Sequence, residues 1–233
     1  MKLKPRLAGV ASFVPSGSVV ADIGTDHAYL PVHLVTEKNC PKVIAVEKSV
    51  KNTIKAKETV SLFNLGYKVD VRTGNGLLAL NKQDGVEVVV LAGMGGINIC
   101  RILMAVGKEL QRYKRIILQP MGDLPLVRRW LFAQGFSFRE KLAVEKGRFY
   151  EIIAAEKGKE MVSEPAYLEL GPSLLKGEDP LVIPWLEGKI KHYEGILQGL
   201  SKARSGKKDS KWRYFYHRYQ IIREVLENIC QGK

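Results

Sequence analysis

The chain has 233 residues, of which 45% are hydrophobic and 26% are charged. This is the composition of an ordinary folded protein, so it excludes a disordered or collagen-like chain and predicts one sizeable domain with an appendage. No apolar run approaches the roughly 18 residues of a membrane span, and no apolar signal core follows the basic start, so we expect a cytoplasmic protein. The three cysteines, Cys40, Cys100 and Cys230, are too scattered for a disulfide framework or a paired-cysteine zinc site, and we expect no metal.

Positive charge is in clear excess. The chain has 37 Lys and Arg residues against 24 Asp and Glu, a formal net charge of +13. Such an excess favours a polyanionic partner, although a basic but unspecialised surface accounts for the charge equally well.

Short β-branched runs alternate with amphipathic stretches through the first 160 residues. Strands are predicted at 19–23, 43–47, 69–72, 86–91 and 115–119, and helices at 50–65 and 97–110. This alternation is typical of an α/β fold, with a mostly parallel sheet covered by helices on both faces. The runs 136–138 and 150–153 have no helix between them, so we expect them to pair antiparallel at one edge.

The pattern changes after residue 162, and we expect one domain over 1–162 and a second region over 163–233. Glycine and proline are frequent from 165 to 184, as in a connector. Two heptad-like patterns follow, from Leu186 to Leu200 and from Trp212 to Ile229, with a polar turn between them. They predict a C-terminal hairpin of two antiparallel helices that pack along their apolar seams as a short coiled coil.

The end of the first predicted strand carries the first chemical signal. Ligands of open parallel sheets bind beyond the carboxyl ends of the strands, and this position holds Asp22, Gly24 and Asp26. The later glycines of a dinucleotide fingerprint are replaced by Asp26 and Tyr29, which disfavours a nicotinamide-dependent oxidoreductase. Carboxylates suit a cofactor with a cationic centre and no phosphate, for which S-adenosyl-L-methionine is the obvious candidate. The structural alternative is that Thr25 or Asp26 caps the next helix.

The ends of later strands extend this pattern. Glu47 ends the second strand, where an acidic side chain accepts hydrogen bonds from ribose hydroxyls, unless it is a plain surface residue. Asn75 and Gly76 follow the third strand, where an adenine ring would lie, and Gly93 and Met94 follow the fourth. Glycines at such positions indicate a close approach of the backbone to a ligand, or else a mobile loop or a tight helix start.

Three segments together resemble one known family. They are Asp22-Ile23-Gly24-Thr25-Asp26-His27-Ala28-Tyr29-Leu30-Pro31, Ala92-Gly93-Met94-Gly95-Gly96 and Ile117-Leu118-Gln119-Pro120. In them the chain is similar to TrmK, the bacterial tRNA (adenine-22-N1)-methyltransferases, and the resemblance spans nearly the whole chain. It implies a class I S-adenosylmethionine methyltransferase fold, Rossmann-like, and methyl transfer to N1 of an adenine in the D-arm of tRNA.

The resemblance also implies roles for particular residues. Asp22, Gly24 and Glu47 would bind the cofactor, and Asp26 would lie near the reacting centre. The family usually has Gly-Asp-Gly where this chain has Gly74-Asn75-Gly76, so weaker cofactor binding is expected. It also tends to carry Asn where this chain has Met121, which removes a polar contact to the target base.

The target base sets further expectations. N1 lies on the pairing edge of adenine, so the base must be unstacked and turned outward. We expect the Asp26 carboxylate to stabilise charge developing on the ring or to accept a hydrogen bond from the exocyclic amine. Tyr29 would stack on the base, or else belong to the core. Gln119 and Pro120, which close the fifth strand, are assigned to the substrate side.

Basic residues around the predicted C-terminal turn indicate an RNA-binding arm. They are Lys202, Arg204, Lys207, Lys208, Lys211 and Arg213, and a solvated helix end is the alternative. Lys2, Lys4 and Arg6 would extend a basic surface over the larger domain. Histidines 27 and 33 lack partners at zinc spacing and are interpreted as ordinary packing or surface residues.

Other functions remain open on the sequence alone. One is methylation of another RNA, a small molecule or a protein within the same fold. Another is a non-catalytic RNA-binding protein that has kept the cofactor pocket.

Overall fold

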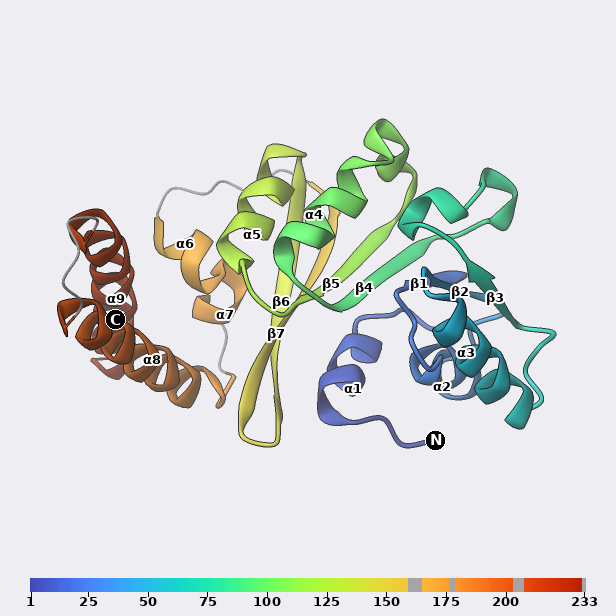
Figure 1. Cartoon of the computed structure of the whole chain (residues 1–233), viewed down its shortest axis with the longest axis horizontal. Helices are drawn as coiled ribbons and strands as arrows, with labels where there is room; N and C mark the ends of the chain where they lie inside the picture. Colours follow the sequence, from blue (N-terminus) through green and yellow to red (C-terminus); the bar gives the residue numbers. More distant parts are fainter. Residues whose placement is uncertain (159–164, 177–178, 203–207, 232–233) are drawn as a thin grey trace. The chain divides into compact units, whose positions relative to one another are not determined.

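The larger part of the chain is organised by a seven-stranded sheet with the order β3-β2-β1-β4-β5-β7-β6 (Figure 1). The computed structural model describes residues 1–158, 165–176, 179–202 and 208–231. The strands are β1 (Val20–Ile23), β2 (Val43–Glu47), β3 (Val69–Thr73), β4 (Val88–Met94), β5 (Arg115–Pro120), β6 (Phe136–Glu145) and β7 (Arg148–Lys157). Strands β1 to β5 pair in parallel, whereas β7 runs antiparallel to both β5 and β6. The predicted α/β fold and its antiparallel edge are confirmed.

Helices cover both faces of this sheet. They are α1 (Pro5–Ser12), α2 (Tyr29–Glu37), α3 (Val50–Leu62), α4 (Gly96–Met104) and α5 (Leu124–Ala133), with short 3-10 helices η1 (Gly76–Ala79), η2 (Lys82–Asp84) and η3 (Gly107–Arg112). The helix predicted over 97–110 ends at Met104, and the chain continues through Gly107, which has a positive φ of 50°, into η3.

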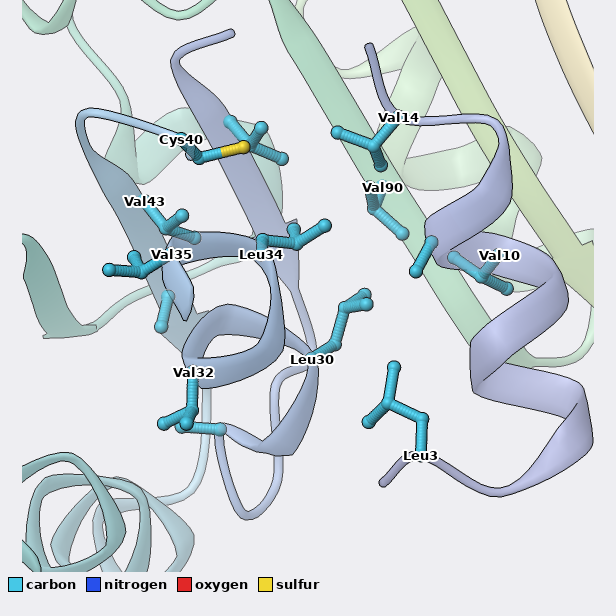
Figure 2. Packing of buried hydrophobic residues seen from close by; sticks show 14 of the residues in the cluster. Leu3, Val10, Val14, Leu30, Val32, Leu34, Val35, Cys40, Val43 and Val90 are labelled. Carbon is cyan, nitrogen blue, oxygen red and sulfur yellow. The ribbon is translucent and has the colours of Figure 1, made fainter. Parts of the chain in front are cut away.

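Two apolar clusters form the core, one on each face. Val88 and Val90 of β4 point into the first cluster, with side chains of α1, α2 and α3. Val89 and Leu91 point into the second, with side chains of α4 and α5. Both sets are buried, because a central parallel strand is covered on its two sides. Figure 2 shows Val10 of α1 and Leu30 and Leu34 of α2 within the first cluster.

Residues 161–233 form a second compact unit, separate from residues 1–160. Its helices are α6 (Pro165–Leu170), α7 (Pro172–Lys176), α8 (Val182–Lys202) and α9 (Lys208–Cys230). The stretch interpreted as a connector thus contains two helices, each beginning at a proline, whose fixed φ suits the first turn of a helix.

Helices α8 and α9 pack against each other along the predicted seams. Leu186 and Ile222 are fully buried, and the rings of Tyr193 and Phe215 lie 6.1 Å apart. The Tyr193 hydroxyl donates to Glu169 of α6 at 2.8 Å, and burial together with this carboxylate raises the pKa of Tyr193. Arg218 of α9 pairs with the same carboxylate at 2.8 Å, so α6 is joined to both long helices. Within the described ranges, no helix is both long and apolar enough to cross a membrane.

Candidate functional site

The loop after β1 turns sharply at the carboxyl edge of the sheet. Gly24 has a φ of 79°, and a Cβ placed on it would lie 2.4 Å from Cε of Met94. The backbone N–H groups of Gly24 and Thr25 both donate to the carbonyl of Val46, at 2.7 and 3.2 Å, which ties this loop to β2. A side chain at position 24 would therefore need a left-handed backbone and would displace the end of the Met94 side chain.

Helix α2 begins too far along the chain for Thr25 or Asp26 to be its N-cap. Its N-cap is Ala28, in a left-handed conformation and without a side-chain hydrogen bond. Neither Thr25 nor Asp26 caps α2, so the structural alternative for these residues is wrong. Asp26 itself has a φ of 48°, and its side chain is 60% exposed.

Asp22, at the end of β1, is buried. Burial raises the pKa of its carboxyl to about 6, and the charge of Glu47 adds to the rise, while the Thr25 hydroxyl and Arg6 oppose it. A cationic group that binds beside this carboxyl group would stabilise its ionised form and lower its pKa.

Glu47 and the loop after β3 lie on the other side of β1. The Glu47 Oε1 atom accepts a hydrogen bond from the backbone N–H of Ser49 at 2.8 Å, which orients the carboxylate at the end of β2. Asn75 is exposed and directly precedes η1. Gly76 follows with a φ of 59°, and a Cβ on it would lie 2.9 Å from a methyl carbon of Ile102. The second glycine of this loop is therefore required by the packing of α4.

The last residues of β4 are held by a side chain from β5. Gly93 and Met94, expected after this strand, belong to it, and its pairing with β5 is irregular between Ala92 and Met94. The backbone N–H of Gly93, which has a φ of 77°, donates to Gln119 Oε1 at 3.2 Å. Arg6 Nη1 donates to the same oxygen at 2.7 Å, and Gln119 Nε2 donates to the carbonyl of Pro120 at 3.0 Å. Gln119 and Pro120 are buried. In this structure Gln119 therefore holds Arg6 and Gly93 in place. Its side chain does not face solvent, where a base could reach it.

A pocket of about 500 Å³ opens at this edge, between the ends of β1 and β4. Its lining combines the β1 loop with the start of the chain: Met1, Lys2, Leu3, Lys4, Arg6, Leu7, Asp22, Gly24, Thr25, Asp26, His27, Tyr29, Leu30, Ala92, Gly93 and Glu145. Tyr29 is 46% exposed and stacks on His27, with ring centroids 5.4 Å apart, so it is not a core residue.

Sequence reasoning underestimated two parts of this pocket. His27, interpreted as an ordinary packing or surface residue, lines it beside Tyr29. Arg6, predicted only as part of a basic surface, reaches Gln119, which lies 113 positions further along the chain. The basic start of the chain gave a weak signal for Arg6, but nothing local indicated its partner.

The predicted RNA-binding residues are only partly described. Lys202, Lys211 and Arg213 are exposed on α8 and α9. Arg204 and Lys207 lie outside the described residues, and for Lys208 only its place in α9 is described.

The residues at this edge fit S-adenosylmethionine. Asp22 and Asp26 provide carboxylates for a cationic group, and Glu47 has a second carboxylate oxygen to offer to ribose hydroxyls. The second and third glycines of a pyrophosphate cradle are replaced by Asp26 and Tyr29, so a dinucleotide does not fit this loop.

This fold and this site define a class I methyltransferase domain. A family model described as a methyltransferase domain matches residues 3–153. The tRNA (adenine(22)-N(1))-methyltransferase of Bacillus subtilis strain 168 is 31% identical over 235 residues, covering 98% of each chain. The solved structure of the B. subtilis M1A22 tRNA methyltransferase TrmK has a TM-score of 0.85 at 31% identity, covering 97% of this chain and 99% of that chain.

Sp1610 of Streptococcus pneumoniae, solved in complex with S-adenosyl-L-methionine, has a TM-score of 0.86 at 33% identity, covering 97% of this chain and 100% of that one. On these similarities, the chain belongs to the TrmK family of bacterial tRNA methyltransferases.

Proposed function

We propose that this protein transfers a methyl group from S-adenosylmethionine to N1 of adenine 22 in tRNA. The observation that carries the proposal is the pocket between β1 and β4, where exposed Asp26 and Tyr29 lie next to the Gly24 turn. It joins a site suited to the cofactor with side chains suited to an adenine. The near full-length similarity to the B. subtilis enzyme supports the target position.

The cofactor site is assigned to the ends of β1, β2 and β3. Asp22 provides the carboxylate for the cationic amino-acid end, and Gly24 gives the backbone clearance. Glu47 accepts hydrogen bonds from the ribose, and the amide oxygen of Asn75 accepts one from the adenine amine. When bound, S-adenosylmethionine supplies a methyl group on a sulfonium sulfur, which leaves as a neutral thioether once the methyl group is transferred. Gly93 and Met94 close the site from β4, and Cε of Met94 would lie 2.4 Å from a Cβ placed on Gly24.

The reacting base needs positioning more than a strong base, because its N1 lone pair is free once the base is unpaired. Tyr29, already stacked on His27, offers a ring face for the adenine. Asp26 lies next in the chain to His27 and stabilises the positive charge that the base acquires on methylation, or accepts a hydrogen bond from the exocyclic amine.

The basic residues of the helical hairpin bind the tRNA body. Lys202, Lys211 and Arg213 are exposed point charges, and such contacts to phosphates position a protein on RNA without reading its sequence. A reaction on tRNA places the protein in the cytoplasm, and no step assigned here requires a metal.

The test is methyl transfer from labelled S-adenosylmethionine to an unmodified tRNA transcript with adenine at position 22, with nucleosides analysed by mass. A matched transcript carrying guanine at that position is the control. We expect N1-methyladenosine in the first transcript alone. Methylation of both would discard the site, and no transfer despite measurable cofactor binding would favour another substrate or a non-catalytic RNA-binding protein.

A further inference from the structure

Helix α9 carries a dense group of aromatic side chains near its start. Of the eight residues from 212 to 219, five are Phe, Trp or Tyr, whereas such residues make up 8% of the whole chain. They are Trp212, Tyr214, Phe215, Tyr216 and Tyr219. Aromatic residues are poorer helix formers than Ala or Leu, so the formation of a helix does not by itself account for them.

Packing against α8 accounts for only part of this group. Phe215 meets the ring of the buried Tyr193 of α8, with ring centroids 6.1 Å apart. Trp212, in contrast, is half-buried, and Tyr216 is 37% exposed. The contact between the two helices therefore leaves aromatic surface open to solvent.

Trp212, Tyr216 and Tyr219 form an aromatic ladder along one face of α9, because residues three and four apart are neighbours on a helix. The rings of Trp212 and Tyr216 stack with centroids 4.6 Å apart and an angle of 17° between their planes. Those of Tyr216 and Tyr219 stack at 6.2 Å and 24°. The Tyr219 hydroxyl donates to Glu194 of α8 at 3.4 Å. The ladder is thus tied to α8 at its Tyr219 end, and Trp212 is its other end.

The Trp212 end of the ladder has room for another ring. Within the described ranges, Tyr216 is the one ring that stacks on Trp212, so no described ring covers the second face of the indole. Side chains of a helix lean toward its N-terminus, so this second face is turned toward the start of α9. The residue one turn earlier is Lys208, which adds a charge and no ring.

Tyr214 lies on the same helix but differs from the ladder. It is 54% exposed, yet the guanidinium carbon of Arg218 lies 4.6 Å from the centre of its ring. Arg218 is held there by its ion pair with Glu169 of α6. Tyr214 is therefore an exposed ring with one face already covered by a cation.

The charges around the open end of the ladder suit a nucleotide. Lys211 and Arg213, both exposed, flank Trp212 in the chain. A nucleotide offers a flat base to an aromatic ring and a phosphate to a neighbouring cation, and stacking of this kind accepts any base. A paired base keeps its faces inside the helical stack, so the partner must be an unpaired base.

We propose that Trp212 binds an unpaired base of the tRNA, stacked on the open end of the aromatic ladder, while Lys211 and Arg213 contact the phosphates beside it; this rests on the proposed function. The base is not the target adenine, because the pocket assigned to that adenine is not lined by any residue of α9 that the structure describes. Phosphate contacts alone do not distinguish a loop from a stem, whereas a stacked base requires a nucleotide outside a duplex. The ladder thus makes the hairpin selective for a tRNA loop.

The test measures the affinity of the full chain for a tRNA transcript and for a fully paired RNA of similar length, each at several salt concentrations. The variants are Trp212→Leu, which removes the ring, Trp212→Tyr, which keeps one, and the control Tyr214→Leu. We expect Trp212→Leu to weaken tRNA binding about fivefold to a hundredfold, the range for one stacked base, and to leave binding of the paired RNA unchanged. The slope of log affinity against log salt should not change, because stacking neutralises no phosphate. Trp212→Tyr should lose less, and Tyr214→Leu should match the wild type.

Fluorescence provides a second measurement that does not depend on the folding of Trp212→Leu. A base stacked on the indole should quench its emission, so tRNA should quench the wild type more than Trp212→Tyr. Trp130 and Trp185 are present in both proteins and supply the background. Equal quenching in the two proteins would contradict the stacking.

The other outcomes separate the rival roles of the ladder. Unchanged tRNA affinity in Trp212→Leu would overturn the inference, because the rings would then only pack the hairpin or meet a different partner. Equal losses for tRNA and paired RNA, or a reduced salt slope, would also overturn it, since Trp212 would then only hold the basic side chains in place. A wild type whose tRNA binding depends on Trp212 but which transfers no methyl group would overturn the proposed function and support the stacking.

Discussion

Asp22 lies at the end of β1 in surroundings that disfavour its charge. Burial raises its pKa to about 6, with Glu47 adding to the effect and Thr25 and Arg6 opposing it. A raised carboxyl pKa means that the folded protein binds a proton more tightly than the unfolded chain. The stability that this group contributes is therefore full below about pH 4 and is lost as the pH rises through about 6.

Cofactor binding should show the opposite pH dependence. The ammonium group of a bound ligand favours ionised Asp22, so affinity for S-adenosylhomocysteine should rise from pH 5 to about 6 by up to tenfold per pH unit and level off above. Calorimetry across this range measures it. Asp22→Asn should bind weakly and lose the pH dependence. An Asp22→Asn profile that still bends near pH 6 would assign the titration to another group.

Gly24 is required for two separate reasons, which a matched pair of variants can separate. Gly24→Ala places a Cβ at a φ of 79° and 2.4 Å from Met94, whereas Gly17→Ala meets the same backbone cost, at a φ of 75°, with open space around it. Each should lose about 1–2 kcal/mol of unfolding free energy from the left-handed conformation. Only Gly24→Ala should also weaken cofactor binding. Equal cofactor affinity in both variants would contradict the placement of the cofactor at Gly24.

Asp26 is the residue assigned to the reacting base. Asn has nearly the same shape and tolerates a positive φ, so Asp26→Asn removes the charge without straining a backbone that has a φ of 48°. We expect kcat to fall by about a hundredfold with the affinity for S-adenosylhomocysteine unchanged. Single-turnover kinetics with the adenine-22 transcript measure the chemical step. Full activity in this variant would remove Asp26 from the mechanism.

At the scale of elements, a buried ion network joins α5 to the antiparallel edge of the sheet. Arg128 of α5 has no exposed surface and pairs through Nε with Glu140 of β6 and through Nη2 with Glu151 of β7, both at 2.7 Å. Strand β7 pairs in turn with β5, whose end carries Gln119. The ion network therefore holds β7 in place beside β5, the strand that carries Gln119.

Removing the cation from this network should be costly. Arg128→Met leaves two buried carboxylates without their cation, and the unfolding free energy should fall by about 3–5 kcal/mol near neutral pH. The loss should shrink in acid, as the carboxyls become protonated. Urea denaturation measures both effects. Arg129→Met, on the exposed face of the same helix, is the control and should stay within about 0.5 kcal/mol. Similar losses in the two variants would show that the ion network does not stabilise the fold.

At the scale of the whole molecule, the net charge of +13 predicts tRNA binding that weakens steeply with salt. Replacing Lys202, Lys211 and Arg213 with Ala should reduce the slope of log affinity against log salt by up to about 0.9 for each phosphate that the variant no longer neutralises. The control replaces three exposed residues of the β6–β7 hairpin, Arg139, Lys141 and Lys146. Equal reductions in both variants would assign the binding to the general field of the protein, with no special role for the helical hairpin.

Features that depend on short stretches of the chain could be predicted from the sequence alone. The alternation of apolar runs predicted the sheet, since strands and helices have different periods, and the heptad seams predicted α8 and α9. Chain order placed Asp22, Gly24 and Glu47 at one edge, because parallel strands end on the same side of a sheet. The resemblance to TrmK rested on the same loops.

Contacts between distant segments were decided only by the tertiary structure. Gln119 was expected on the substrate side, yet it is buried and holds Arg6 and Gly93. Arg128, Glu140 and Glu151 are of residue types that usually lie on the surface. The packing of α5 on β6 and β7 instead buries them as an ion network. A sequence records which side chains are available. The burial and the partners of each side chain depend on which segments the fold brings together. Burial and partners in turn set the pKa values, the charge pairing and the access to the pocket.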